Sequence, residues 1–327
     1  MSCLQSAVMS SETSFSIVVP THNEGERLTQ TVSRLMATGP DDYEVIVVDD
    51  FSTDNSIEQL RQSQPGVRVV RPPQRLGPPA AKNFGAQFAG GSCILWSDAH
   101  IDPQPGWPQT FAGLLADPLV GAVGPAVASQ QNPASVGFGL RWKNAALDVE
   151  WLPRSGDEPH AVPIVSSLFM GMRREVFEQT GGFDPGLIRW GGGEMELSFR
   201  LWSLGYECRI APRSRVSHLF RSRFPYRVSP AEILHNLIRV AMVHFEQDRL
   251  AAVIAALRDN PAFPKAMALV LEGDAWARRA DVRARRVAAD EAFFERFPSP
   301  GLVRRPTPVP LRTPDGWGQP KRDLIRA

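Results

Sequence analysis

Residues 94–100 read ILWSDAH, a short apolar run that ends in Asp98 and His100. A strand that ends in Asp-x-His can place a carboxylate and an imidazole on the same side of a turn, where both can hold one divalent cation. The pattern is short, and an Asp at a strand end is often only a turn residue that satisfies its own backbone. Its meaning therefore depends on the rest of the chain.

Short β-rich runs alternate with segments of helical composition in the first part of the chain. The β-rich runs are residues 15–19, 45–48, 67–70 and 94–96. The helical segments are residues 24–36, 56–62 and 79–89. This alternation predicts a parallel sheet wrapped by helices.

Polar residues follow three of the predicted strands. They read Thr21-His22-Asn23-Glu24, Asp49-Asp50-Phe51-Ser52 and Ser97-Asp98-Ala99-His100. Ligands of open α/β sheets bind at the carboxyl ends of the strands, so we expect the three clusters to form one site. Asp50 has an alternative interpretation, as a turn residue or as the cap of the helix expected near Ser56.

A second block, residues 162–218, contains an apolar run at 163–172, a Gly-rich loop at 191–193 and a predicted helix at about 194–204. Gly205 is the expected end of that helix. Apolar residues form two rows along it, so we expect the helix to be mostly buried.

Two glutamates occupy the first turn of this helix, where the helix dipole favours carboxylates. Glu196 lies four residues before Arg200, and this spacing predicts a structural ion pair. Glu194 has no such partner in the sequence.

The chain has 327 residues, with 36 Lys and Arg against 35 Asp and Glu, and a net charge of +1 at pH 7. No global field therefore favours nucleic acid or an anionic membrane surface as a partner. The three cysteines show no CxxC spacing, and we find neither a signal core nor an apolar stretch long enough for a transmembrane segment. We expect a cytoplasmic protein with reduced thiols.

Five strings carry a resemblance to a known family: VVPTHNEGE, VIVVDDFSTD, SDAH, WGGGEMELSFRLWSLG and SRVSHLFRSRFPY, at residues 18–26, 45–54, 97–100, 190–205 and 214–226. The chain resembles nucleotide-sugar glycosyltransferases of family 2, and most closely the catalytic domain of polypeptide N-acetylgalactosaminyltransferases. The likeness covers roughly two thirds of the chain. It implies the mixed α/β, Rossmann-like GT-A fold of nucleotide-diphospho-sugar transferases, with a helical C-terminal extension.

The resemblance also implies roles for individual residues. A UDP-sugar donor would have its uracil and ribose bordered by His22 and Asp50, with Arg75 and Lys82 nearby. Arg221 and Tyr226 match residues that close over the diphosphate. The family's metal ligands, which hold Mn²⁺ or alternatively Mg²⁺, match Asp98, His100 and His218. Without the resemblance, the sequence position of His218 is that of an ordinary core or surface histidine.

Two departures from the family pattern bear on the sugar and on the reaction course. The peptide-modifying enzymes read Trp-Gly-Gly-Glu-Asn where this chain has Gly193 and Glu194, so their sugar-contacting Glu is lost. The same register places Glu194 where many inverting family 2 enzymes have an Asp, and we hypothesise that it is the general base. The relatives with Asn at this position are retaining, so both stereochemical courses stay open. Ser166 and Ser167 replace a Gly-Gly pair, which indicates a different sugar pocket. Trp190 is either a core residue or a ring that stacks on a sugar on the acceptor side.

Four segments are expected: a disordered tail at 1–13, a catalytic domain at 14–228, a helical extension at 229–297 and a Pro-rich tail at 298–327. The extension contains the run ARRADVRARR at 277–286, which is either a solvated helix face or a surface for an acidic acceptor, a partner or a membrane.

These features favour a metal-dependent transferase that moves a hexosyl or N-acetylhexosaminyl group from a UDP-sugar to an acceptor on a peptide, a glycan or a small molecule. One alternative is a non-catalytic protein that binds sugar nucleotides as a scaffold, because the family's Glu is missing at Gly193. A nucleotidyltransferase fits less well, since residues 20–24 offer no Gly-rich basic loop after the first strand.

Overall fold

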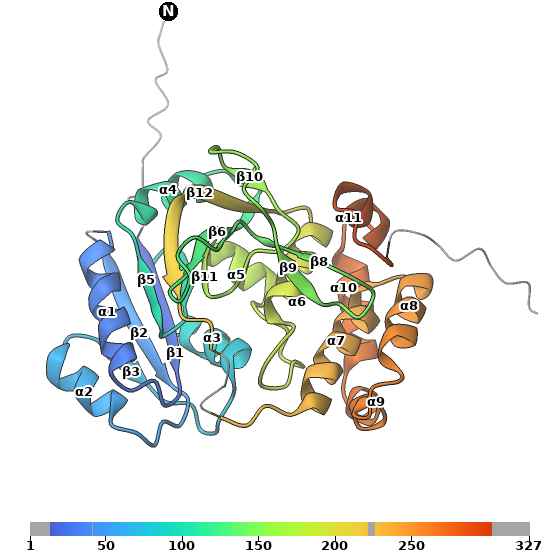
Figure 1. Ribbon diagram of the computed structural model, residues 1–327, viewed down its shortest axis with the longest axis horizontal. Helices are drawn as coiled ribbons and strands as arrows, with labels where there is room; N and C mark the ends of the chain where they lie inside the picture. Colours follow the sequence, from blue (N-terminus) through green and yellow to red (C-terminus); the bar gives the residue numbers. More distant parts are fainter. Residues whose placement is uncertain (1–13, 41, 222–225, 303–327) are drawn as a thin grey trace, which may run out of the picture.

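The computed structural model describes residues 14–40, 42–221 and 226–302 (Figure 1). The tail expected at 1–13 lies outside the described residues, as does most of the tail expected from 298 onward. Residues 298–302 are described, and Leu302 is packed into the core beside the C-terminal helices.

The expected alternation of strands and helices is confirmed. The strands are β1 (Phe15–Thr21), β2 (Tyr43–Asp49), β3 (Arg68–Val70) and β4 (Cys93–Ser97). The helices are α1 (Glu26–Thr38), α2 (Ser56–Ser63) and α3 (Pro78–Ala86). β1 pairs in parallel with both β2 and β4, and β2 pairs in parallel with β3. The carboxyl ends of these strands therefore meet at one edge.

The second half of the chain extends the same sheet and makes it mixed. It adds β6 (Val120–Ser129), β11 (Phe169–Arg173), β12 (Glu207–His218), β10 (His160–Ala161), β5 (Ile101–Pro103) and β7 (Val136–Gly137). The strand order is β10-β12-β6-β11-β4-β1-β2-β3, with β5 beside β12 and β7 beside β6. β11 runs antiparallel to β4, so the sheet is not wholly parallel.

The central strand β6 was not predicted, because its sequence VGAVGPAVAS is rich in Gly, Ala and Pro, which strands usually avoid. Close packing explains these small residues. A Cβ at Gly121 would lie 2.7 Å from Cβ of Tyr206, so a larger side chain would push the next layer off the sheet.

Helices cover both faces of the sheet, and the C-terminal helices pack at one end of it (Figure 1). The covering helices are α4 (Trp107–Leu115), α5 (Arg174–Thr180) and α6 (Gly193–Ser203). The C-terminal group comprises α7 (Pro230–His244), α8 (Gln247–Leu257), α9 (Phe263–Glu272), α10 (Ala275–Arg285) and α11 (Asp290–Arg296). A separate hairpin of β8 (Leu140–Trp142) and β9 (Val149–Trp151) joins their apolar core. Among the described residues, no helix is both long and apolar enough to cross a membrane.

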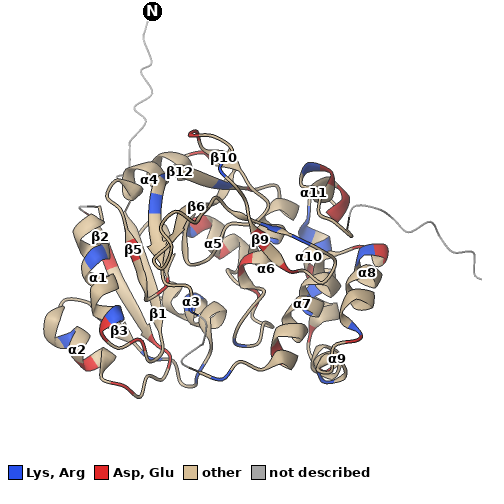
Figure 2. Ribbon diagram, in the orientation of Figure 1, with Lys and Arg blue, Asp and Glu red and all other residues tan. Residues whose placement is uncertain are grey.

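The Arg-rich run at 277–286 is held by contacts inside the molecule. Arg283 and Arg286 pair with Glu246 at 2.5 and 2.8 Å, and Arg279 donates to a backbone carbonyl on α7. Acidic and basic residues are interspersed along these helices (Figure 2). This arrangement favours a structural role over a surface for an acidic partner.

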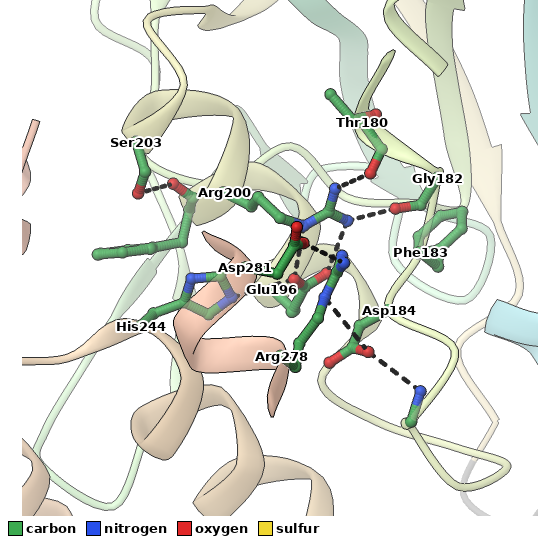
Figure 3. Close-up of polar contacts among 12 residues, drawn as sticks. Thr180, Gly182, Phe183, Asp184, Glu196, Arg200, Ser203, His244, Arg278 and Asp281 are labelled. Carbon is green, nitrogen blue, oxygen red and sulfur yellow. Dashed lines mark hydrogen bonds and ion pairs between the residues drawn. The ribbon is translucent and has the colours of Figure 1, made fainter. Parts of the chain in front are cut away.

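α6 is the expected buried helix, and the predicted pair of Glu196 with Arg200 is confirmed at 2.7 Å (Figure 3). His244 on α7 also contacts the Glu196 carboxylate at 3.0 Å. Arg200 donates in addition to the carbonyls of Thr180 and Gly182. All of these charges are buried, so the network joins α6 to both the α7 helix and the loop after α5.

Replacing Glu196 with Gln is expected to lower the free energy of unfolding at pH 7 by about 3 kcal/mol, because Arg200 and His244 stay buried without the charge they face. Burial alone would raise the pKa of Glu196, yet Arg200 and His244 hold that pKa below its ordinary value of 4.5. The carboxylate therefore stabilises the fold fully above about pH 4.5, and this contribution is lost as the pH falls further. Urea unfolding across this pH range measures both effects.

Arg213→Ala is the control, since Arg213 pairs with Glu158 where both side chains are exposed. Exposed pairs are worth at most about 1 kcal/mol. Equal stability of the wild type and the Glu196→Gln variant at pH 7 would contradict the structural role.

Candidate functional site

A cleft of about 560 Å³ opens at the carboxyl ends of β1, β2 and β4. Every site residue expected from the sequence lines it. These residues are His22, Asp50, Arg75, Lys82, Asp98, His100, Trp190, Glu194, His218, Arg221 and Tyr226. The structure thus brings together side chains from both halves of the chain, while their individual roles stay predictions.

Asp98, His100 and His218 form a cluster whose potential ligand atoms all lie within 4.8 Å of one another. Asp98 follows β4 and His100 precedes β5, so these two are close in sequence. His218 ends β12 and is brought in because β12 pairs with β5, with His218 opposite Ile101. The register of this pairing therefore decides whether a third ligand is present.

The cluster fits a divalent cation. Both ring nitrogens of His218 are buried and make no hydrogen bond among the described residues. Nε2 of His218 is 3.4 Å from Asp98 Oδ2, which is proximity without hydrogen-bond geometry. Buried polar atoms normally have partners, and a metal ion would supply one here. A carboxylate with two imidazoles is a donor set that suits Mn²⁺.

Electrostatics favour the ligating form of these residues. Burial alone would raise the pKa of Asp98, but the Lys82 ammonium and the two imidazoles hold that pKa well below its usual range. Burial lowers the pKa of His218, although Asp98 opposes the shift. At neutral pH, Asp98 is therefore ionised and His218 is neutral, as metal binding requires.

Lys82 lies at the metal end of the cleft rather than in contact with His22 or Asp50. It is buried on α3, and its Nζ donates to Asp98 Oδ1 at 3.2 Å. The same ammonium donates to the Ser167 carbonyl at 2.5 Å and to the Ser167 hydroxyl at 3.2 Å. Lys82 therefore fixes Asp98 and the wall formed by Ser167, one of the two serines that depart from the family pattern.

Another part of the cleft is aromatic and cationic. The ring of His22 meets Tyr226 edge-on, with centroids 5.8 Å apart. The Arg75 guanidinium lies over the Tyr226 ring, 5.0 Å from its centroid. Nδ1 of His22 is 2.8 Å from the Asp50 carbonyl oxygen. These four residues, expected beside the nucleotide, are therefore neighbours.

The carboxylate of Asp50 accepts hydrogen bonds from the backbone amides of Leu76 and Gly77, at 2.6 and 2.8 Å. It therefore holds the loop that carries Arg75. The alternative interpretation of Asp50 as the cap of the following helix is wrong, because the Asp54 carboxylate contacts the Ser56 backbone amide at 3.1 Å instead.

Glu24 is a site residue for which no individual role was predicted from the sequence. Its buried carboxylate accepts a hydrogen bond from Arg221 and lies 3.3 Å from Nδ1 of His100. Burial would raise the pKa of Glu24, but His100 and Arg221 together hold it below its ordinary value. Glu24 thus connects the metal cluster to the Arg221 segment. Its place in the polar cluster after the first strand is the sequence feature from which a role in the site could have been predicted.

Trp190 and Glu194 lie on the remaining wall of the cleft. Trp190 is partly exposed there, so it is not a core residue. Within the part of the chain that the structure describes, no ion pair or hydrogen bond holds the Glu194 carboxylate, in contrast to Glu196. A Cβ at Gly193 would lie 3.2 Å from Pro79 and 3.3 Å from Phe183, so the missing Glu corresponds to a tightly packed position.

The family model described as glycosyl transferase family 2 matches residues 16–181, half of the chain. A second model, described as the N-terminal domain of galactosyltransferase, matches residues 162–222. These matches identify the protein class as glycosyltransferases, with the polar cluster at the edge of the sheet. The chain belongs to glycosyl transferase family 2.

Among curated proteins, polypeptide N-acetylgalactosaminyltransferase 10 of Homo sapiens is 28% identical over 71% of this chain and 42% of its own length. The putative polypeptide N-acetylgalactosaminyltransferase 13 of Drosophila melanogaster is 31% identical over 69% of this chain and 47% of its own length. The chain therefore spans less than half the length of these relatives.

Two solved structures are similar in fold. The crystal structure of GalNAc-T7 with UDP, GalNAc and Mn²⁺ has a TM-score of 0.72 at 23% identity, covering 88% of this chain and 57% of that one. The mannosyltransferase PcManGT of Pyrobaculum calidifontis, in complex with GDP-Man and Mn²⁺, has a TM-score of 0.51 at 21% identity, covering 84% and 86%. The expected GT-A fold, a mixed α/β sheet with C-terminal helices, is confirmed.

Replacing Glu24 with Gln is expected to weaken Mn²⁺ binding by about 10- to 100-fold, because carboxylates that orient metal-ligating histidines contribute to affinity on this scale. Titration calorimetry with Mn²⁺ alone measures this without any sugar nucleotide. Glu26→Gln is the matched control, since Glu26 is exposed in the first turn of α1. Equal affinity of the two variants would show that Glu24 does not orient His100.

Proposed function

We propose that the protein is a metal-dependent glycosyltransferase that moves a sugar from a UDP-sugar to an acceptor hydroxyl. The observation that carries the proposal is the cluster of Asp98, His100 and His218 at the ligand-binding edge of a family 2 sheet. The GalNAc-T7 structure with UDP and Mn²⁺, and the S. aureus TarS structure in complex with UDP-GlcNAc, support a sugar nucleotide and a metal in this fold.

The nucleotide would bind at the aromatic and cationic end of the cleft. His22 and Tyr226 present ring faces and edges to a flat base, and Arg75 adds a positive charge beside them. Stacking on an aromatic ring is a general way to bind a base, and guanidinium groups suit phosphate oxygens. The diphosphate would then extend from this end toward the metal cluster and Arg221.

In the transfer step, an acceptor oxygen attacks the anomeric carbon as the bond from that carbon to the diphosphate breaks. Mn²⁺ bound at the cluster would supply Lewis-acid stabilisation of the negative charge that develops on the leaving phosphate. Arg221, held by Glu24 at the edge of the cluster, supplies a second positive charge for the same oxygens. The electron pair of the broken bond leaves with UDP.

Glu194 would receive the acceptor proton in this proposal. It lines the cleft from the first turn of α6, and no buried partner holds its carboxylate among the described residues. Trp190 lines the same cleft and would contact the sugar or the acceptor. A carboxylate that takes the proton during attack is general-base catalysis, which inverts the anomeric centre in a single displacement.

The donor sugar and the acceptor are open within this proposal. Gly193 and the serines at 166 and 167 stand where the peptide-modifying relatives have other residues, so the transferred group is a hexosyl or N-acetylhexosaminyl group that need not be N-acetylgalactosamine. A peptide, a glycan and a small molecule all present hydroxyl groups. The cytoplasmic location expected from the sequence stays a prediction.

The scaffold alternative rests on the Gly193 position and predicts that UDP and metal bind without any sugar transfer. The intact cluster opposes it, as does the Glu194 carboxylate, with which no described residue pairs. A nucleotidyltransferase needs a basic Gly-rich loop after the first strand. Residues 20–24, between β1 and α1, do not form such a loop, so this alternative remains less well supported.

Release of UDP from a panel of UDP-sugars, with Mn²⁺ present or chelated, tests the proposal. We expect one donor to be hydrolysed in a metal-dependent way, and the His218→Ala variant to lose at least about 100-fold of this rate, since several kcal/mol of charge stabilisation is removed. Circular dichroism of the variant checks that the fold is kept. Near-normal release by a well-folded His218→Ala variant would contradict the metal role.

The anomeric configuration of the first-formed product tests the role of Glu194. We expect inversion, measured by NMR, and a fall of about 100-fold or more in the transfer rate of Glu194→Gln with little change in UDP affinity. Clean retention of configuration would exclude Glu194 as the base of a single displacement.

A further inference from the structure

The loop between Asp184 and α6 has an irregular backbone that needs outside support. Arg189, Gly191 and Gly192 all have positive φ angles, at 48°, 94° and 80°. Such a run cannot use the hydrogen bonds of a helix or a sheet, so its amides and carbonyls need other partners. The loop carries Trp190 and leads directly into the helical turn that bears Glu194.

One side chain supplies most of these partners. Asn236 on α7 is fully buried, and its Nδ2 donates to the carbonyls of Ile188, Trp190 and Gly191 at 2.9, 3.0 and 3.0 Å. Its Oδ1 accepts from the Ile188 amide at 2.8 Å. A single amide thus fixes four backbone groups within four consecutive residues.

The next turn of α7 anchors the start of the same loop. Arg239 donates to both oxygens of Asp184, at 2.8 and 2.9 Å, and pairs with Asp274 on the other side at 2.7 Å. Arg278 lies 3.9 Å from the same Asp184 carboxylate (Figure 3). Helix α7 therefore holds the loop at its beginning and, through Asn236, at its middle.

We propose that Asn236 is a positioning residue for the transfer reaction, which fixes the backbone of residues 188–191 so that Trp190 and Glu194 face the cleft. The inference rests on the proposed function. It assigns the C-terminal helices a part in the site, because the loop that leads into the proposed base is held from α7.

The chemistry of the side chain explains why an amide is needed at this position. Three carbonyl oxygens converge on Nδ2, and only a donor group satisfies them. An Asp of the same shape would place an acceptor against these oxygens, and a buried carbonyl left without a partner costs about 1–3 kcal/mol. The loop would relax away from α7 and take Trp190 with it.

Asn236→Asp is the variant that tests the proposal, with hydrogen exchange, UDP affinity in the presence of Mn²⁺, and UDP release from the active donor as readouts. We expect amides of residues 186–192 to exchange at least about tenfold faster, with UDP affinity within about twofold of the wild type. UDP release should fall by about 10- to 100-fold, because a displacement near 1 Å costs on this scale. A purely structural residue would not separate rate from affinity in this way.

Two controls separate positioning from stability. Asn260→Asp is the matched exchange, since exposed Asn260 uses only its acceptor oxygen, toward the Ala262 amide. Val253→Ala removes two buried methyl groups from α8, at a residue that does not line the cleft, and lowers stability. Both controls should release UDP at the wild-type rate.

The outcomes are distinguishable. Release by Asn236→Asp within about twofold of the wild type, or equal loss of rate in Val253→Ala, overturns the positioning role and leaves the proposed function standing. No release from any donor by the wild type, with or without Mn²⁺, overturns the proposed function and the positioning role together.

Discussion

The antiparallel pairing of β5 with β12 places His218 opposite Ile101, next to His100, and the proposed metal site depends on this register. Asp98 and His100 alone are two ligands on one turn, which is a common pattern in strand ends. His218, the proposed third ligand, lies beside them only because it ends the long strand β12, which pairs with β5. A one-residue slip of this pairing would turn the His218 side chain to the other face of the sheet.

Two buried clusters of titratable residues in this molecule differ in whether their polar atoms have partners. The Glu196 carboxylate is saturated by Arg200 and His244, so it is a structural element that joins α6 to α7. By contrast, both imidazole nitrogens of His218 are buried without hydrogen bonds among the described residues. A buried group without a partner is costly unless it has another task, and this contrast separates the site from the scaffold.

Much of the sheet could be predicted, because the alternation of apolar runs and amphipathic segments is local information. β6 could not, since its glycines are explained by residues distant in sequence: Gly121 packs against Tyr206, and Gly124 against Val165. The same limit applies to the site. The polar clusters at strand ends located the cleft, but the partners of Glu24 and the loop contacts of Asn236 are tertiary. For Asp50, the helix-cap interpretation was compatible with the sequence, and only the tertiary contact with the Leu76 amide excludes it; its place beside a nucleotide stays a prediction.

The central claim is that Asp98, His100 and His218 together hold one divalent ion beside the diphosphate of a sugar nucleotide. Anomalous diffraction from crystals grown with Mn²⁺ and UDP tests it most directly. The account predicts one manganese peak within bonding distance of the Asp98 carboxylate and both imidazoles, with phosphate oxygens completing its coordination. UDP bound in the cleft with no manganese at these three residues, or with manganese at another position, would contradict it.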